Sequence, residues 1–142
     1  MSRLPRHLSA VGIGLALAGC SDMCANKGVK LLDSPDGTKR AVLFVRDCGA
    51  TTGWSTQVAI VSPGNVPTGI GNAFTTSDKT GGVALGDWYS AWGSWADIEW
   101  TGPASLTVRY AVGSNIIKAK KQVKGVSITY QETTVPADQI AR

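Results

Sequence analysis

Apolar residues recur along this chain in short runs, and the runs predict β-strands. Residues 41–45 are apolar at every position, which predicts a strand buried on both faces. A second strand is expected over residues 57–61. Leu106, Val108 and Tyr110 alternate with polar neighbours, the pattern of a strand that buries one face. Weaker runs predict further strands over residues 72–75, 97–100, 116–123 and 126–130.

Turn-forming residues separate these runs. The sequence Ser-Pro-Asp-Gly at 34–37 predicts a turn, because proline presets the first central backbone angle and glycine relieves the exit. Other connections are expected at residues 101–103 and 124–125, as a polar hairpin loop over 46–56 and as a loose stretch over 62–87. The sum is six or seven strands with little helix. This predicts an all-β domain, an antiparallel meander that forms either a twisted sheet or a small sandwich.

The first 19 residues have the features of a signal peptide. Arg3 and Arg6 precede an apolar stretch of about 10 residues, too short to span a bilayer as a lasting helix. The sequence Leu-Ala-Gly-Cys follows at 17–20 and resembles the bacterial lipobox. In that motif a peptidase cuts before the cysteine, whose sulfur receives a diacylglycerol. The alternative is an ordinary secretory signal with a chance cysteine.

The lipobox resemblance implies a lipoprotein of the bacterial cell envelope, anchored in a membrane by acyl chains such as palmitate on Cys20. Ser21 rather than aspartate follows the cysteine, which favours the outer membrane over the inner one. The expected division is a signal peptide over 1–19, a lipidated N-terminus and tether over 20–32, a β-domain over 33–131 and a tail over 132–142.

Composition narrows the possible functions. The 142 residues allow one ordinary domain, and 17% charged residues indicate a packed core. Cleavage removes Arg3 and Arg6, so 14 basic residues become 12 against 10 acidic ones, and the net charge falls from +4 to +2. The basic balance is therefore not the footprint of a nucleic-acid-binding protein. No catalytic motif, cofactor motif or metal-ligand spacing is apparent.

Cys24 and Cys48 remain once Cys20 carries lipid. An exported chain favours a structural disulfide between them, which would stabilise the fold by about 3–4 kcal/mol. A redox or metal-binding thiol pair and two unpaired thiols are the alternatives.

The segment Arg-Asp-Cys-Gly-Ala-Thr-Thr-Gly-Trp-Ser-Thr at 46–56, with the upstream Ser-Pro-Asp-Gly, carries a further resemblance. It is similar to a family of small uncharacterised bacterial proteins, many of them lipoproteins. The likeness covers most of residues 33–130, and it implies no established activity.

Polar groups are densest in the 46–56 loop, which is the candidate ligand loop. Arg46, Asp47, Thr51 and Thr52 could hold a small polar ligand beneath Trp54. The alternative is a hairpin loop whose hydroxyls satisfy its own backbone.

Three other sets of residues have both a functional and a structural interpretation. Trp88, Trp92 and Trp95 form either an aromatic platform for a glycan or lipid interface, or part of the core. The lysines at 118, 120, 121 and 124 either contact anionic lipid headgroups or protect a sheet edge. Asp97 and Glu99 are either an acid pair or simply solvated.

These observations favour a membrane-anchored, non-catalytic module that binds an envelope protein or a glycan. A small-ligand sensor or enzyme built on the 46–56 loop is the alternative, and an inhibitor of an envelope enzyme such as lysozyme is a third possibility.

Overall fold

The structure is a computed structural model that describes residues 23–49, 53–77 and 93–139. Its regular elements are almost all β-strands, nine of them in the described residues, with one 3₁₀ turn, η1. The elements are β1 Ala25–Asp33, β2 Arg40–Asp47, β3 Trp54–Val61, β4 Phe74–Ser77, β5 Ala96–Gly102, β6 Ser105–Ala111, β7 Asn115–Ala119, β8 Gln122–Val123, β9 Val126–Thr133 and η1 Ala137–Gln139.

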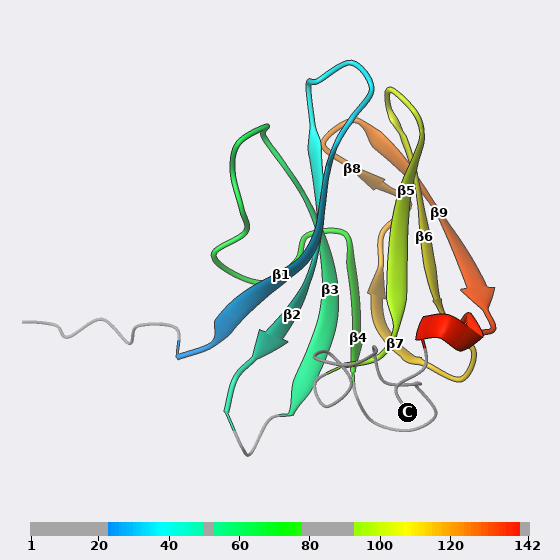
Figure 1. Cartoon of the computed structure of the whole chain (residues 1–142). Coiled ribbons are helices and arrows are strands. Elements are labelled where there is room, and N and C mark those ends of the chain that lie inside the picture. The colour runs from blue at the N-terminus through cyan, green and yellow to red at the C-terminus, as the bar shows by residue number, and fades with distance from the viewer. Residues whose placement is uncertain (1–22, 50–52, 78–92, 140–142) are drawn as a thin grey trace, which may run out of the picture.

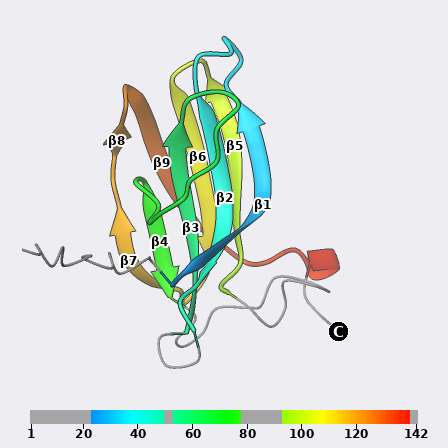
Figure 2. The same ribbon diagram turned by 90° about the vertical axis from the view of Figure 1, so that its left-hand side faces the viewer.

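Two sheets face each other, which confirms the all-β prediction in its sandwich form (Figure 1). One sheet has the strand order β1-β2-β3-β4-β7, and the other has the order β5-β6-β9-β8. The run expected as one strand over 116–123 divides between them, as β7 in the first sheet and β8 in the second. Figure 2 shows this continuation from β7 to β8 along one side of the sandwich.

One strand pair departs from a simple meander. β9 runs parallel to β6, whereas the other paired strands are antiparallel. The reason is that the chain leaves the second sheet after β6, pairs with β4 as β7, and returns through β8 before it reaches β9. Such a crossover brings the chain back in its original direction.

The β-domain begins earlier than predicted, because most of the expected tether is strand β1. This strand pairs with β2 from Ala25 opposite Asp47 to Asp33 opposite Arg40. An irregularity in register near Gly28 interrupts the alternation of polar and apolar residues, which hides the strand in the sequence. Partly buried Val29 and Leu32 nonetheless pack against the core.

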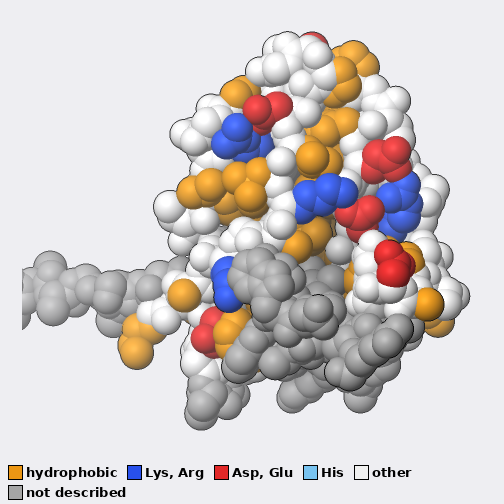
Figure 3. Space-filling view, viewed as in Figure 1, with side chains coloured by type: hydrophobic (Ala, Val, Ile, Leu, Met, Phe, Trp, Pro, Cys, Tyr) orange, Lys and Arg blue, Asp and Glu red, His pale blue; other side chains and the backbone are white. Residues whose placement is uncertain are grey.

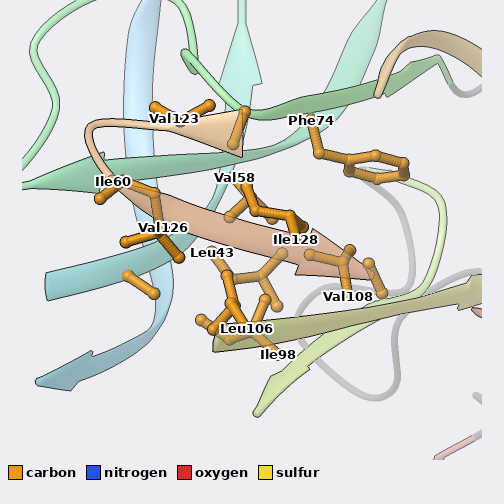
Figure 4. Packing of buried hydrophobic residues seen from close by; sticks show 13 residues of the cluster. Leu43, Val58, Ile60, Phe74, Ile98, Leu106, Val108, Val123, Val126 and Ile128 are labelled. Carbon is orange, nitrogen blue, oxygen red and sulfur yellow. The ribbon is translucent and has the colours of Figure 1, made fainter. Parts of the chain in front are cut away.

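The main core lies between the sheets (Figure 4). Leu43, Val58 and Ile60 from the first sheet meet Ile98 and Leu106 from the second, and each is at most 1% exposed. The predicted double-faced burial of residues 41–45 is confirmed. Removing apolar surface from water stabilises a fold by about 25 cal/mol per Å², so this contact between the sheets is the main stabilising term.

An aromatic stack closes the core on the β7 side. Phe74 packs against Tyr110 and Tyr130, with ring centroids 5.7 Å apart in both pairs. The Tyr130 hydroxyl, from the second sheet, lies 2.7 Å from the carbonyl oxygen of Lys120 and 3.2 Å from that of Ala73. The hydroxyl thus ties the second sheet to one end of the β4–β7 pair, where β4 begins and β7 ends.

The described part of the expected C-terminal tail packs on the domain. β9 continues to Thr133, and Val135 is buried. The indole nitrogen of Trp95 donates a 2.8 Å hydrogen bond to the side-chain oxygen of Gln139. Apolar Val135, two residues before the 3₁₀ turn, supplies the contact that the polar tail sequence did not suggest.

Candidate functional site

The candidate ligand loop is shorter than predicted. β2 extends to Asp47 and β3 begins at Trp54, and these two residues are paired across the strands. The sandwich therefore takes up both ends of the expected 46–56 loop. Thr51 and Thr52 lie outside the described residues.

Arg46 faces away from the interior, on the outer face of the first sheet, yet it is only 3% exposed. Its guanidinium donates a 2.6 Å hydrogen bond to the side-chain oxygen of Asn26 on β1. The Asn26 amide in turn donates to the carbonyl oxygens of Pro67, at 2.9 Å, and Gly69, at 2.8 Å. Arg46 thus supports a distant loop through Asn26.

The other described residues of the candidate loop also have structural contacts. The Asp47 carboxylate accepts a 2.8 Å hydrogen bond from the backbone of Gly49, which is typical of an Asx turn. Trp54 is half-buried against the cluster that holds Val45 and Trp95. These contacts favour the structural interpretation of the loop.

The predicted disulfide is present in the structure. The sulfur atoms of Cys24 and Cys48 are 2.04 Å apart, and the bond joins the chain just before β1 to the chain just after β2. It therefore extends the β1–β2 pairing by one cross-link at the end where the hairpin loop begins.

The tryptophan cluster can be assessed at one position. Trp95 is 3% exposed and packs in the core, so the structural interpretation holds for this ring. Trp88 and Trp92 lie outside the described residues.

The four lysines do not act as one cluster. Lys118 lies on β7, an edge strand of the first sheet, and its ammonium group donates a 2.8 Å hydrogen bond to the Gly71 carbonyl oxygen. Lys120 and Lys121 are exposed in the connection to β8. Lys124 lies in the β8–β9 turn.

Asp97 and Glu99 form ion pairs, so the expectation that they are merely solvated is wrong. The Asp97 carboxylate lies 2.7 Å from the Lys30 ammonium group on β1 and 3.1 Å from the Arg109 guanidinium on β6. Arg109 also pairs with Glu99. Hydrogen bonding to Glu99 and the charges of both carboxylates raise the pKa of Arg109. Figure 3 shows positive and negative side chains side by side on this part of the surface.

Residues 62–73 form a loop across the outer face of the first sheet, where the sequence predicted only a loose stretch (Figure 2). Three amide side chains fasten this outer loop. Besides Asn26, the Gln57 side-chain oxygen accepts a 2.6 Å hydrogen bond from the Gly71 backbone. Asn72 exchanges two hydrogen bonds of 2.8 Å with the backbone of Ile60. The amide side chains of Asn26, Gln57 and Asn72 are the only feature of the sequence that could have indicated an ordered loop here.

Two hollows adjoin the outer loop. The smaller, of about 140 Å³, is mainly apolar and is lined by Asn26, Gly28, Val42, Phe44, Val66 and Pro67. The larger is an open cleft of about 580 Å³ between the start of the outer loop and the β8–β9 turn. We call it the turn cleft, and its lining residues are Val61, Ser62, Gly64, Asn65, Val66, Pro67, Thr68 and Lys124.

Neither metal ligands nor a spanning helix were found in the described ranges. Among residues 23–49, 53–77 and 93–139, the side chains of His, Cys, Asp and Glu form no group of three or more that could hold a metal ion. Within the same residues, no helix has the length and apolar character to cross a membrane.

Comparisons of the chain with protein-family models, with curated proteins and with solved structures found no match.

Proposed function

We propose that this chain is a lipid-anchored protein of the bacterial cell envelope whose β-sandwich is a non-catalytic binding module. The Leu-Ala-Gly-Cys sequence at 17–20 supports the anchor on Cys20. A bond between Cys24 and Cys48 fits export to an oxidising compartment, since such bonds are rare in cytosolic proteins. The resemblance to small bacterial lipoproteins points the same way.

The position of the disulfide is the observation that supports the proposed orientation of the domain on the membrane. Cys24 follows Cys20 by four positions, so the connecting chain reaches at most about 14 Å. Cys24 is bonded to Cys48 at the end of β2. A lipid on Cys20 would therefore hold this end of the first sheet close to the membrane, with little freedom to tumble.

The opposite end of the first sheet would point away from the membrane. It contains the β1–β2 turn at residues 34–39 and the end of β3 at Val61, which is paired with Arg40. Strands of 8 residues separate the two ends by about 26 Å. The turn cleft lies at this anchor-distal end, where a partner across the envelope could reach it.

The charged groups support binding rather than catalysis. Asp97, Glu99 and Arg109 neutralise one another in ion pairs. Arg46, which the sensor or enzyme alternative requires as a ligand contact, is buried and bonded to Asn26. The module is thus proposed to recognise an envelope protein or glycan at its anchor-distal end.

Photo-crosslinking in living cells tests this orientation. A benzophenone amino acid replaces either Met23, which is 92% exposed beside the disulfide, or Gln122, which is exposed near the β8–β9 turn. The probe at 23 should form lipid adducts, and the probe at 122 should form adducts with other envelope components. Equal lipid labelling at both positions would overturn the orientation. In the matched Cys20→Ser chain the lipid adducts at 23 should disappear, and their persistence would overturn the anchor.

A further inference from the structure

Two turns of fixed backbone form the facing walls of the turn cleft. On one wall the Asn65 backbone donates a 3.1 Å hydrogen bond to the Ser62 carbonyl oxygen, and Gly64 has φ +83°. Proline followed by a glycine with positive φ is typical of a type II turn. On the other wall Lys124 and Gly125 have φ values of 50° and 79°, which fits the type I′ turn of a two-residue hairpin.

Both walls stand on the core. Val123 and Val126, on either side of the β8–β9 turn, pack in the same buried cluster as Ile60 at the end of β3 (Figure 4). The cleft is therefore shaped before any ligand arrives, which lowers the entropic cost of binding.

Lys124 is an unfavourable residue for its position in the turn. Among the described residues, Lys124 is the only residue other than glycine with a positive φ. Asparagine, aspartate or glycine is strongly preferred at such a turn position. Its ammonium group forms no hydrogen bond or ion pair with any described residue. The unfavourable backbone angle of Lys124 and its position in the cleft point to a role for its side chain in binding.

The polar side chains in the outer loop and beneath it fall into two groups. The first group fastens the loop through side-chain hydrogen bonds and consists of Asn26, Gln57 and Asn72. The side chains of Ser62, Asn65 and Thr68 line the turn cleft and make no hydrogen bond within the described part of the chain. The cleft thus combines one cation, three uncharged polar groups and an apolar wall from Val61, Val66 and Pro67.

We infer that the turn cleft binds an anionic saccharide. Lys124 pairs with a carboxylate of the sugar, and Ser62, Asn65 and Thr68 exchange hydrogen bonds with its hydroxyl groups. The apolar wall contacts the C–H face of a sugar ring. The volume of about 580 Å³ lies in the range of about 300–1,000 Å³ that is usual for small-ligand sites. This inference rests on the proposed function for the claim that the cleft faces away from the membrane.

Calorimetric titration of the full chain in detergent micelles tests the inference. The probes are trigalacturonate, which carries three carboxylates, and the neutral maltotriose. Trigalacturonate should bind, with an affinity that falls about two- to fivefold between 20 mM and 300 mM salt, whereas maltotriose should bind about two- to fivefold more weakly at low salt. These expectations follow because the contact to Lys124 is exposed and screened by salt.

The variant Lys124→Asn separates binding from folding. Asparagine suits a positive φ, so the melting temperature should stay the same or rise, while trigalacturonate affinity should fall about two- to fivefold. The matched control Lys121→Asn removes the same charge three residues away, outside the cleft, and should bind as the wild type does.

Three results would overturn the inference: no heat with trigalacturonate, equal affinity for maltotriose, or equal losses in the two lysine variants. Each of these results concerns the turn cleft alone, because the chain in micelles should bind the saccharide whether or not Cys20 carries lipid. A missing acyl group on Cys20 would instead refute the proposed anchor and leave the titration unchanged.

Discussion

Asn26 and Arg46 are opposite each other on β1 and β2, and the guanidinium of Arg46 donates a 2.6 Å hydrogen bond to the Asn26 side-chain oxygen. The same asparagine donates to two carbonyl groups of the outer loop. One amide side chain therefore joins a buried cation, the edge strand and the loop. This arrangement explains why an arginine of the predicted ligand loop is buried.

Substitution of Asn26 by alanine should release the outer loop. It removes an acceptor from buried Arg46 and a donor from two carbonyl groups, so the free energy of unfolding should fall by about 1–3 kcal/mol. Urea denaturation measures this change, and hydrogen exchange at residues 66–71 should become faster. Asn65→Ala is the control, since its side chain has no such bonds in the described residues. Equal stability of the two variants would refute the role of Asn26.

Gly71 is required by a close approach of two backbones. A Cβ atom at this position would lie 2.8 Å from the Val58 carbonyl oxygen. Gly71→Ala should therefore destabilise the fold by about 1–3 kcal/mol, the usual cost of overpacking. At Gly69 a Cβ would have no atom within 4 Å, so Gly69→Ala should change stability by less than about 0.5 kcal/mol. Thermal melting of the two variants compares them, and a reversed order would contradict the packing of this loop.

Asp97 joins the two sheets, whereas Glu99 pairs within one sheet. Asp97 contacts Lys30 of the first sheet and Arg109 of the second. Asp97→Asn should cost about 1 kcal/mol, and Glu99→Gln less, because exposed ion pairs contribute about 0.2–1 kcal/mol each. The difference, measured by urea denaturation, should shrink in 0.5 M salt. A larger loss for Glu99→Gln would show that Asp97 does not join the sheets.

Tyr130 should make the fold sensitive to high pH. Its burial raises the pKa of the hydroxyl from 10.0 to about 12. The folded pKa is above the unfolded one, so the stabilisation from this group is complete below pH 10 and is lost as pH rises through about 12. Between pH 10 and 12 the wild type should lose stability more steeply than Tyr130→Phe. Parallel pH curves from denaturant titrations would contradict this burial effect.

Local signals predicted the parts of the fold that depend on neighbouring residues. The apolar run of β2, the alternation in β6 and the turn at 34–37 are encoded within a few positions. That turn is closed by a 2.8 Å hydrogen bond from Gly37 to Ser34, and hydrogen bonds from Ser34 and Thr38 lower the pKa of Asp36. The Cys24–Cys48 bond was predicted from an expected exported location and from the two cysteines that remain if Cys20 carries lipid.

Long-range relationships could not be predicted from such patterns. β1 is an irregular edge strand, and its polar sequence resembles a tether. Only its pairing with β2 identifies it as a strand. The outer loop depends on Asn26, more than 40 positions from the carbonyl groups that it binds. Likewise Asp97 meets Lys30 only because the edges of the two sheets lie together. The turn cleft combines residues from positions 61–68 and 124, so no local motif marks it.

The lipid anchor is tested most directly by mass spectrometry of the N-terminal peptide of the protein recovered from bacterial membranes. The peptide should begin at Cys20 and carry a diacylglycerol group on the cysteine sulfur. A chain that keeps residues 1–19, or a Cys20 sulfur without an acyl-bearing group, would contradict the anchor and the orientation derived from it.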